Sequence, residues 1–209
     1  MKDNSFIPLA FKKLEEQEIR ERALNFYENI KSRRSVRHFS EQSIPKEVIE
    51  HIILSAGTAP SGAHKQPWTF CAVSNKELKD KIRKAAEEEE YLNYTKRMSE
   101  QWLKDLEPFN TNWEKPMLSD APWLIIVFRK AFDLVEGEKI KNYYINESVG
   151  IACGFLLAAI HEAGLVSLTH TPSPMQFLCE ILNRPSNEKA YLLIPVGYPA
   201  DKCEVPKLD

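Results

Sequence analysis

A segment past the middle of the chain, residues 142–162, most restricts the folds that this sequence can adopt. Its pattern predicts a long helix, and residues 149–160 are apolar on nearly every side, with small residues spaced among them. A helix of this kind must be buried all round, and a small domain often achieves this against a second subunit. The segment therefore predicts a core helix and favours a homodimer.

Short apolar runs and helical patterns alternate along the rest of the chain. Buried strands are predicted at residues 68–73, 123–128, 165–169 and 191–197. Further helices are predicted at residues 14–30, at 43–57 with Ser43 as cap and Pro45 near the start, at 74–82 with Ser74 and Glu77 at capping-box spacing, and at 173–182. Strands separated by helices indicate an α/β fold of the α+β type, a mixed sheet flanked by helices.

The length of 209 residues suits one domain, 1–209, with one unusual part. Residues 87–118 are densely charged, hold Tyr91, Tyr94 and Trp102, and lack a clean apolar stripe. This predicts a helical surface insertion, or lid, rather than core.

Charge and composition exclude several classes of protein. A net charge of -2 gives no overall attraction to nucleic acid or to an anionic membrane, and no apolar run approaches the length of a bilayer span. The four cysteines form no C-x-x-C pair and the five histidines have no metal-ligand spacing. We expect a soluble, cytoplasmic protein with reduced thiols, no metal and no membrane anchor.

The stretch SRRSVRHF, residues 32–39, concentrates three guanidinium groups and two hydroxyls between two predicted helices. Guanidinium forks bind phosphate bidentately, and serine hydroxyls can fill the remaining phosphate oxygens. Taken alone, such a stretch is more often a solvated basic turn.

Together with APSGAH at residues 59–64, PW at 67–68 and PVGYP at 195–199, this stretch resembles the FMN-dependent nitroreductase superfamily. The resemblance implies an FMN whose phosphate and pyrimidine edge lie near Arg33, Arg34, Ser35 and Arg37. It also implies that Pro60, Ser61 and Gly62 pass beside the flavin ring. In this superfamily the flavin lies at a subunit interface, and electrons come ultimately from NAD(P)H or a partner reductase.

A narrower resemblance is to the iodotyrosine deiodinase branch of that superfamily. It spans residues 32–208 and includes TAPSGAH at 58–64, the run EEEE at 87–90 leading into NY at 93–94, and TNW with Lys115 at 111–115. It implies that Glu90 binds the ammonium of a halotyrosine, that Tyr94 and Lys115 bind its carboxylate, and that the backbone N–H of Ala63 donates to its phenolate. A slip of one residue within 87–90 would change the glutamate.

The segment THTP, residues 169–172, follows the third predicted strand. The resemblance implies that Thr169, His170 and Thr171 contact the flavin, and that the Thr171 hydroxyl bonds N5 and steadies a flavin semiquinone, which makes Thr171 the catalytic candidate. His170 departs from the threonine of vertebrate-like sequences. The branch also carries a basic phosphate contact shortly after the counterpart of residues 205–208, and this sequence ends at Asp209.

The resulting hypothesis is FMN-dependent reductive dehalogenation of halotyrosines, iodotyrosine giving tyrosine and iodide, in one-electron steps. One alternative is an NAD(P)H-dependent nitroreductase or quinone reductase. The other is a flavin or aromatic amino-acid binding protein without turnover.

Overall fold

The computed structural model describes residues 6–207, which divide into two compact units with the boundary between Arg33 and Arg34. The first unit contains helix α1 (Glu16–Ile30), close to the helix predicted at residues 14–30. None of its side chains is buried, and ion pairs such as Glu18–Arg22 run along its surface. The expectation of one domain over 1–209 stays a prediction.

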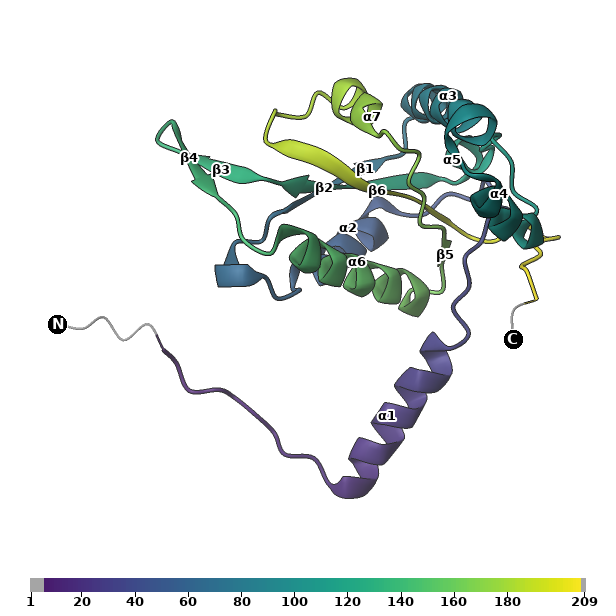
Figure 1. The fold of residues 1–209 in the computed structure, drawn as a ribbon. Coiled ribbons are helices and arrows are strands. Elements are labelled where there is room, and N and C mark those ends of the chain that lie inside the picture. The colour runs from purple at the N-terminus through teal and green to yellow at the C-terminus, as the bar shows by residue number, and fades with distance from the viewer. Residues whose placement is uncertain (1–5, 208–209) are drawn as a thin grey trace. The chain divides into compact units, whose positions relative to one another are not determined.

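The second unit is organised on a four-stranded sheet with the order β1-β2-β6-β5 (Figure 1). Its strands are β1 (Trp68–Val73), β2 (Trp123–Lys130), β5 (Val166–Ser167) and β6 (Glu188–Gly197). All neighbouring strands are antiparallel, whereas the isolated bridge between Ser35 and Ser167 is parallel. The sheet is therefore mixed, and Ser35 of the arginine-rich stretch lies at its β5 edge.

Helices cover both faces of the sheet because β2 is apolar on both (Figure 1). Ile125 and Val127 join the core that contains α2 (Lys46–Gly57) and α6 (Ile145–Glu162). The alternate residues Leu124, Ile126 and Phe128 join the second core, with α3 (Lys76–Leu92) and α7 (Gln176–Ile181). The predicted α/β class with flanking helices is confirmed.

Both predicted helix caps are wrong by one or two residues. Helix α2 follows Pro45 directly and has no side-chain cap, so Ser43 lies outside it. At the start of α3 the cap is Asn75, whose Oδ1 accepts a hydrogen bond of 2.8 Å from the Leu78 N–H, rather than Ser74. Asparagine and serine cap equally well, so spacing alone could not choose between them.

A hairpin that the sequence did not predict extends from the sheet, formed by β3 (Phe132–Val135) and β4 (Glu138–Lys141). Its turn is at Glu136 and Gly137, both of which have positive φ. Since β4 is exposed throughout, it lacks the apolar alternation that reveals a strand.

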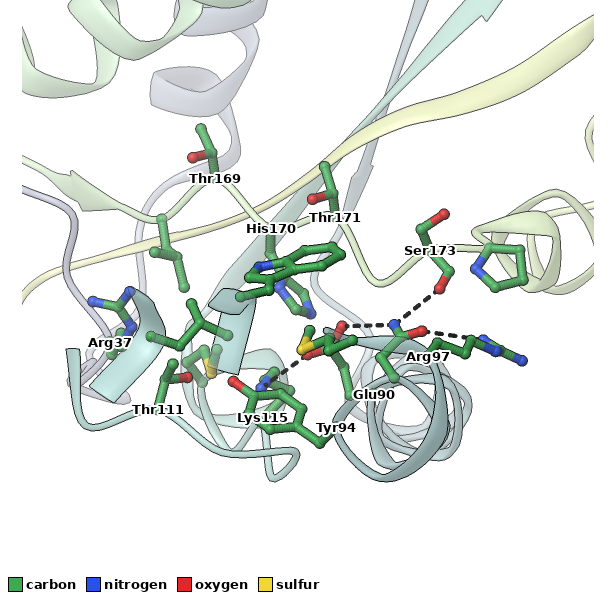
Figure 2. Close-up of a pocket in the computed structure, with 17 residues that line it drawn as sticks. Arg37, Glu90, Tyr94, Arg97, Thr111, Lys115, Thr169, His170, Thr171 and Ser173 are labelled. Carbon is green, nitrogen blue, oxygen red and sulfur yellow. Dashed lines mark hydrogen bonds and ion pairs between the residues drawn. The ribbon is translucent and has the colours of Figure 1, made fainter. Parts of the chain in front are cut away.

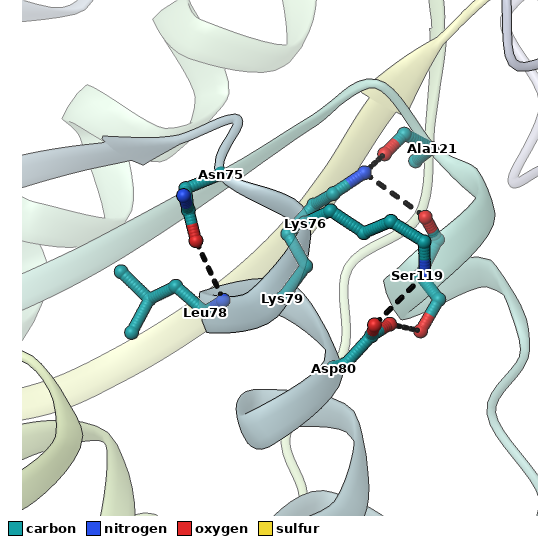
Figure 3. Close-up of polar contacts among 7 residues, drawn as sticks. All are labelled: Asn75, Lys76, Leu78, Lys79, Asp80, Ser119 and Ala121. Atoms are coloured by element: carbon teal, nitrogen blue, oxygen red, sulfur yellow. Dashed lines mark hydrogen bonds and ion pairs between the residues drawn. The ribbon is translucent and has the colours of Figure 1, made fainter.

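The segment expected to be a lid, residues 87–118, begins within the last turns of α3 and leads back to the sheet at β2. It contains η2 (Asn93–Arg97), α4 (Glu100–Leu106), η3 (Glu107–Phe109) and α5 (Met117–Asp120). Figure 3 shows how its return is fixed: the Lys79 ammonium donates to the carbonyls of Ser119 (2.9 Å) and Ala121 (2.6 Å), at the C-terminal end of α5. This contact ties the end of the segment to the first turns of α3.

Helix α6 is buried on one side only within this chain. Val149, Ala152 and Leu156 are fully buried, whereas Ile151 and Phe155 are each 44% exposed. The expectation of burial all round is therefore not met by these contacts alone. No helix among residues 6–207 is long and apolar enough to cross a membrane.

Candidate active site

A cavity of about 680 Å³ lies between the 87–118 segment and the loop after β5. It brings together seven of the residues singled out in the sequence, namely Arg37, Glu90, Tyr94, Lys115, Thr169, His170 and Thr171. Figure 2 shows Thr169, His170 and Thr171 on one wall, with Tyr94, Glu90 and Lys115 opposite them. Parts of the sequence that lie far apart thus converge on one site.

A buried ion pair forms the charged end of this cavity. The Lys115 Nζ lies 3.2 Å from Oε2 of Glu90, and the two side chains are only 3% and 8% exposed. Lys115 also donates to the carbonyl of Asn112. Burial of an ion pair is expensive unless its partners are well placed, so such a pair is unusual without a functional reason.

The geometry of α3 distinguishes the four consecutive glutamates. Glu87 pairs with Arg83 and accepts a 2.7 Å hydrogen bond from the Lys115 backbone N–H. Glu88 is exposed, and Glu89 forms an ion pair of 2.6 Å with Arg97. Of the four, Glu90 lines the cavity, because it lies on the inward face of the helix.

Tyr94 follows one turn after Glu90 and lies beside the same ammonium, with Lys115 Nζ 5.2 Å from its ring centroid. Burial raises the pKa of Tyr94, so its hydroxyl is neutral and can donate a hydrogen bond. Burial also lowers the pKa of Lys115, against the opposing attraction of Glu90. The cavity thus offers a cation, a carboxylate and a phenol within a few ångströms.

The opposite wall is fixed by the sheet. The backbone of His170 exchanges hydrogen bonds of 2.9 and 3.0 Å with Leu193 of β6, which holds Thr169 and Thr171 on either side of it. Burial, with the charges of Lys115 and Arg37, lowers the pKa of His170 to about 3. Its imidazole is therefore neutral, and its buried Nε2 has no hydrogen-bond partner among the described residues.

The residues around this wall suit the FMN that the resemblance implies. Arg37 and the hydroxyls of the two threonines present donors to a cofactor rich in phosphate and carbonyl oxygens, and Nε2 of His170 is a buried polar atom that such a cofactor can satisfy. Arg37 also stacks on Phe109 of the 87–118 segment, with 5.8 Å from the ring centroid to its guanidinium carbon.

Only part of the predicted phosphate-binding set can be located at this site. Ser35 lies beside β5, and the adjacent Val36 N–H donates to the Ser167 carbonyl at 3.0 Å. The Arg34 guanidinium donates to the Pro206 carbonyl. Arg33 is the last residue of the first compact unit.

Pro60, Ser61, Gly62 and Ala63 do not line the cavity. They lie instead near the start of α6, where the Gly62 N–H donates to Ser148 Oγ at 3.3 Å. Within this tight turn, η1 (Gly62–His64), Ala63 has a φ of 49°, a left-handed conformation that is unfavourable for alanine. Within one chain, residues 60–63 therefore lie apart from the residues that line the cavity.

Asn93 and Arg97 also line the cavity, although neither of them was assigned a role in the site from the sequence. With Glu90 and Tyr94 they occupy positions i, i+3, i+4 and i+7, which is the spacing of one helical face and would have revealed them. The backbone there is a π-helical turn, a feature that is frequent at functional sites.

Comparison with known proteins gives a consistent result. The model of the nitroreductase family matches residues 30–198. A protein of Haliscomenobacter hydrossis described as iodotyrosine deiodinase is 59% identical over 205 residues, which cover 98% of this chain and 92% of the relative. Human iodotyrosine deiodinase 1 is 48% identical over 206 residues, covering 97% of this chain and 71% of the relative.

Solved structures agree with these relatives. The crystal structure of an oxidized iodotyrosine deiodinase bound to FMN and 3-iodo-L-tyrosine superposes with a TM-score of 0.75 at 33% identity, covering 88% of this chain and 95% of the other. An FMN-bound nitroreductase of Bacteroides fragilis has a TM-score of 0.66 at 21% identity and covers 88% and 93% of the two chains, a likeness in fold alone.

Proposed function

Since the chain belongs to the nitroreductase family and, within it, to the iodotyrosine deiodinases, we propose that it is an FMN-dependent enzyme that removes halide reductively from halotyrosines. Iodotyrosine would give tyrosine and iodide. FMN, when bound, supplies the electrons for this reduction. The residues of the chain bind and orient the amino acid.

The buried Glu90–Lys115 pair is the observation that carries the proposal. A free halotyrosine is a zwitterion, and the pair presents one charge of each sign, 3.2 Å apart, inside the cavity. A ligand that brings both charges can give Glu90 an ammonium and Lys115 a carboxylate in exchange for their contact with each other. A ligand with one charge would leave the other side chain buried without a partner, which is costly.

Tyr94 supports the same arrangement. Its hydroxyl can donate to the ligand carboxylate beside Lys115, and both side chains close over the cavity from the lid segment. The clamp made by Glu90, Tyr94 and Lys115 would exclude water from the head group and orient the aromatic ring towards the opposite wall.

On that wall we assign the cofactor to Arg37, Thr169, His170 and Thr171, with Arg33, Arg34 and Ser35 completing its phosphate site. The Thr171 hydroxyl would donate to N5 of the flavin and favour transfer of single electrons over hydride transfer. The reaction consumes two electrons and one proton, which replaces the halogen at the ring carbon as halide leaves.

We propose a homodimer in which a second copy supplies the group formed by Pro60, Ser61, Gly62 and Ala63. Two observations support it: this group lies away from the cavity of its own chain, and the nearby α6 leaves Ile151 and Phe155 exposed. In the dimer the first three residues would pass beside the flavin. The Ala63 N–H would donate to the substrate phenolate, and a hydrogen bond to the charged form lowers the phenol pKa. An ortho halogen lowers it further, so halotyrosines would bind in preference to tyrosine.

We place the enzyme in the cytoplasm, with NAD(P)H as the ultimate reductant through a soluble reductase. The four cysteines are all unpaired, which suits a reducing compartment.

Titration of the purified yellow protein with 3-iodotyrosine tests the function. Flavin fluorescence should be quenched on binding, and dithionite should then release iodide with formation of tyrosine. Rapid oxidation of NAD(P)H with no iodotyrosine binding would indicate a nitroreductase instead, and quenching with no halide release would indicate a binding protein.

A further inference from the structure

We propose that Asn93 is a positioning residue for Glu90, holding its carboxylate in place for the ammonium of an amino acid, an inference that rests on the function proposed above. Asn93 is not part of the charged clamp itself. It lies one helical turn after Glu90, and is only 9% exposed.

The side chain of Asn93 connects three groups around the cavity. Its Nδ2 donates to the Ser173 carbonyl at 2.9 Å and lies 3.5 Å from Oε1 of Glu90. Its Oδ1 accepts a hydrogen bond of 3.2 Å from Nη1 of Arg97. A buried amide whose two ends are both used has a defined orientation, because a flipped amide would place like atoms against each other.

These contacts join the two walls of the cavity. Ser173 is two residues beyond Thr171, and Glu90 and Arg97 belong to the segment that faces it (Figure 2). The amide therefore fixes the last turn of α3 against the loop after β5. The backbone carbonyl of Asn93 also accepts from the Met98 N–H at 2.9 Å, which closes the π-helical turn.

The two oxygens of Glu90 have different neighbours. Oε2 faces Lys115 at 3.2 Å, whereas Oε1 is the oxygen beside Asn93. When Lys115 turns to a ligand carboxylate, Oε2 becomes available to the ligand ammonium, and the amide of Asn93 remains as the protein group that holds the other oxygen. Loss of Asn93 should therefore weaken recognition of the ammonium specifically.

The test compares two ligands with the FMN-loaded protein and the variants Asn93→Ala and Asn93→Leu. Leucine keeps the branched shape and the number of heavy side-chain atoms of asparagine, so it leaves no cavity if alanine impairs folding. We expect 3-iodotyrosine to bind about tenfold more weakly to both variants. Binding of 3-(4-hydroxy-3-iodophenyl)propanoate, which lacks the ammonium, should change by less than about twofold.

A double-mutant cycle gives a second readout with iodotyrosine alone. In a Glu90→Gln background, Asn93→Leu should weaken binding by less than about twofold, because the carboxylate it positions is gone. Asn75→Ala is the matched control: it removes the cap at the other end of the same helix, so it should lower the melting temperature without a change in either affinity.

Equal losses for both ligands, or an undiminished loss in the Glu90→Gln background, would reduce Asn93 to a general structural role and overturn the inference. So would an unchanged affinity of both Asn93 variants for iodotyrosine. If the unaltered protein failed to bind iodotyrosine at all, the proposed function would be refuted and this inference with it. The two failures are therefore distinguishable.

Discussion

Replacing Lys115 by methionine removes the positive charge of the clamp while keeping most of the length of the side chain. In the structure, Lys115 lies 3.2 Å from Glu90 and both side chains are almost fully buried. Removing one partner of such a pair leaves the other charge buried alone, which typically costs about 3–5 kcal/mol of stability. Loss of a hydrogen bond to the charged carboxylate of the ligand costs about 1.5–3 kcal/mol, or roughly 10–150-fold in Kd.

Flavin fluorescence measures this loss directly, since quenching by 3-iodotyrosine gives Kd and the absorbance of the flavin gives cofactor occupancy. Lys96→Met is the control, because Lys96 is an exposed residue of the same segment. This variant should bind iodotyrosine like the unaltered protein. The assignment of Lys115 to the substrate carboxylate would be refuted if Lys115→Met, with FMN fully bound, had a Kd within about twofold of the unaltered protein.

Three further predictions concern the rest of the site. Thr171→Ala should bind iodotyrosine with nearly unchanged affinity but release iodide much more slowly under dithionite; an unchanged rate would remove Thr171 from the chemistry. Because the pKa of His170 is lowered from 6.5 to about 3, the unfolded chain takes up this proton first as pH falls. Between about pH 8 and pH 5 the protein should therefore lose about 2 kcal/mol more unfolding free energy than His170→Thr, and parallel pH profiles in urea denaturation would contradict this. Lys79→Met leaves the carbonyls of Ser119 and Ala121 without their donor and should lower the unfolding free energy by about 2 kcal/mol. Its Kd for iodotyrosine should stay within about twofold, and a larger change would mean that this contact shapes the site.

Apolar runs in the sequence located most of the sheet. β1, β2 and β6 were predicted because each contributes residues to both cores and is therefore largely apolar. β5 was also predicted, at residues 165–169, and is shorter in the structure. The β3–β4 hairpin has no such signal, because its strands are largely exposed and are held by each other rather than by a core. The cap of α3 differed because the neighbouring residues Ser74 and Asn75 can both accept from the same backbone N–H, whereas α2 has no side-chain cap.

The site could be predicted only as a set of residues. Glu90 and Tyr94 are four residues apart, a spacing that puts them on one face of a helix, and the same count adds Asn93 and Arg97. The spacing could not show that Lys115, from the returning limb, meets Glu90 in an ion pair, because this depends on how that limb packs on α3, where the Lys115 N–H donates to Glu87. Nor could it show that Gly62 lies away from the cavity of its own chain.

The most direct test of the central claim is a crystal structure of the protein with FMN and 3-iodotyrosine. Our account predicts that Glu90 contacts the ligand ammonium, that Lys115 and Tyr94 contact its carboxylate, and that the halogenated ring lies against the flavin. A bound ligand whose head group faced solvent, with the Glu90–Lys115 pair still closed, would contradict it.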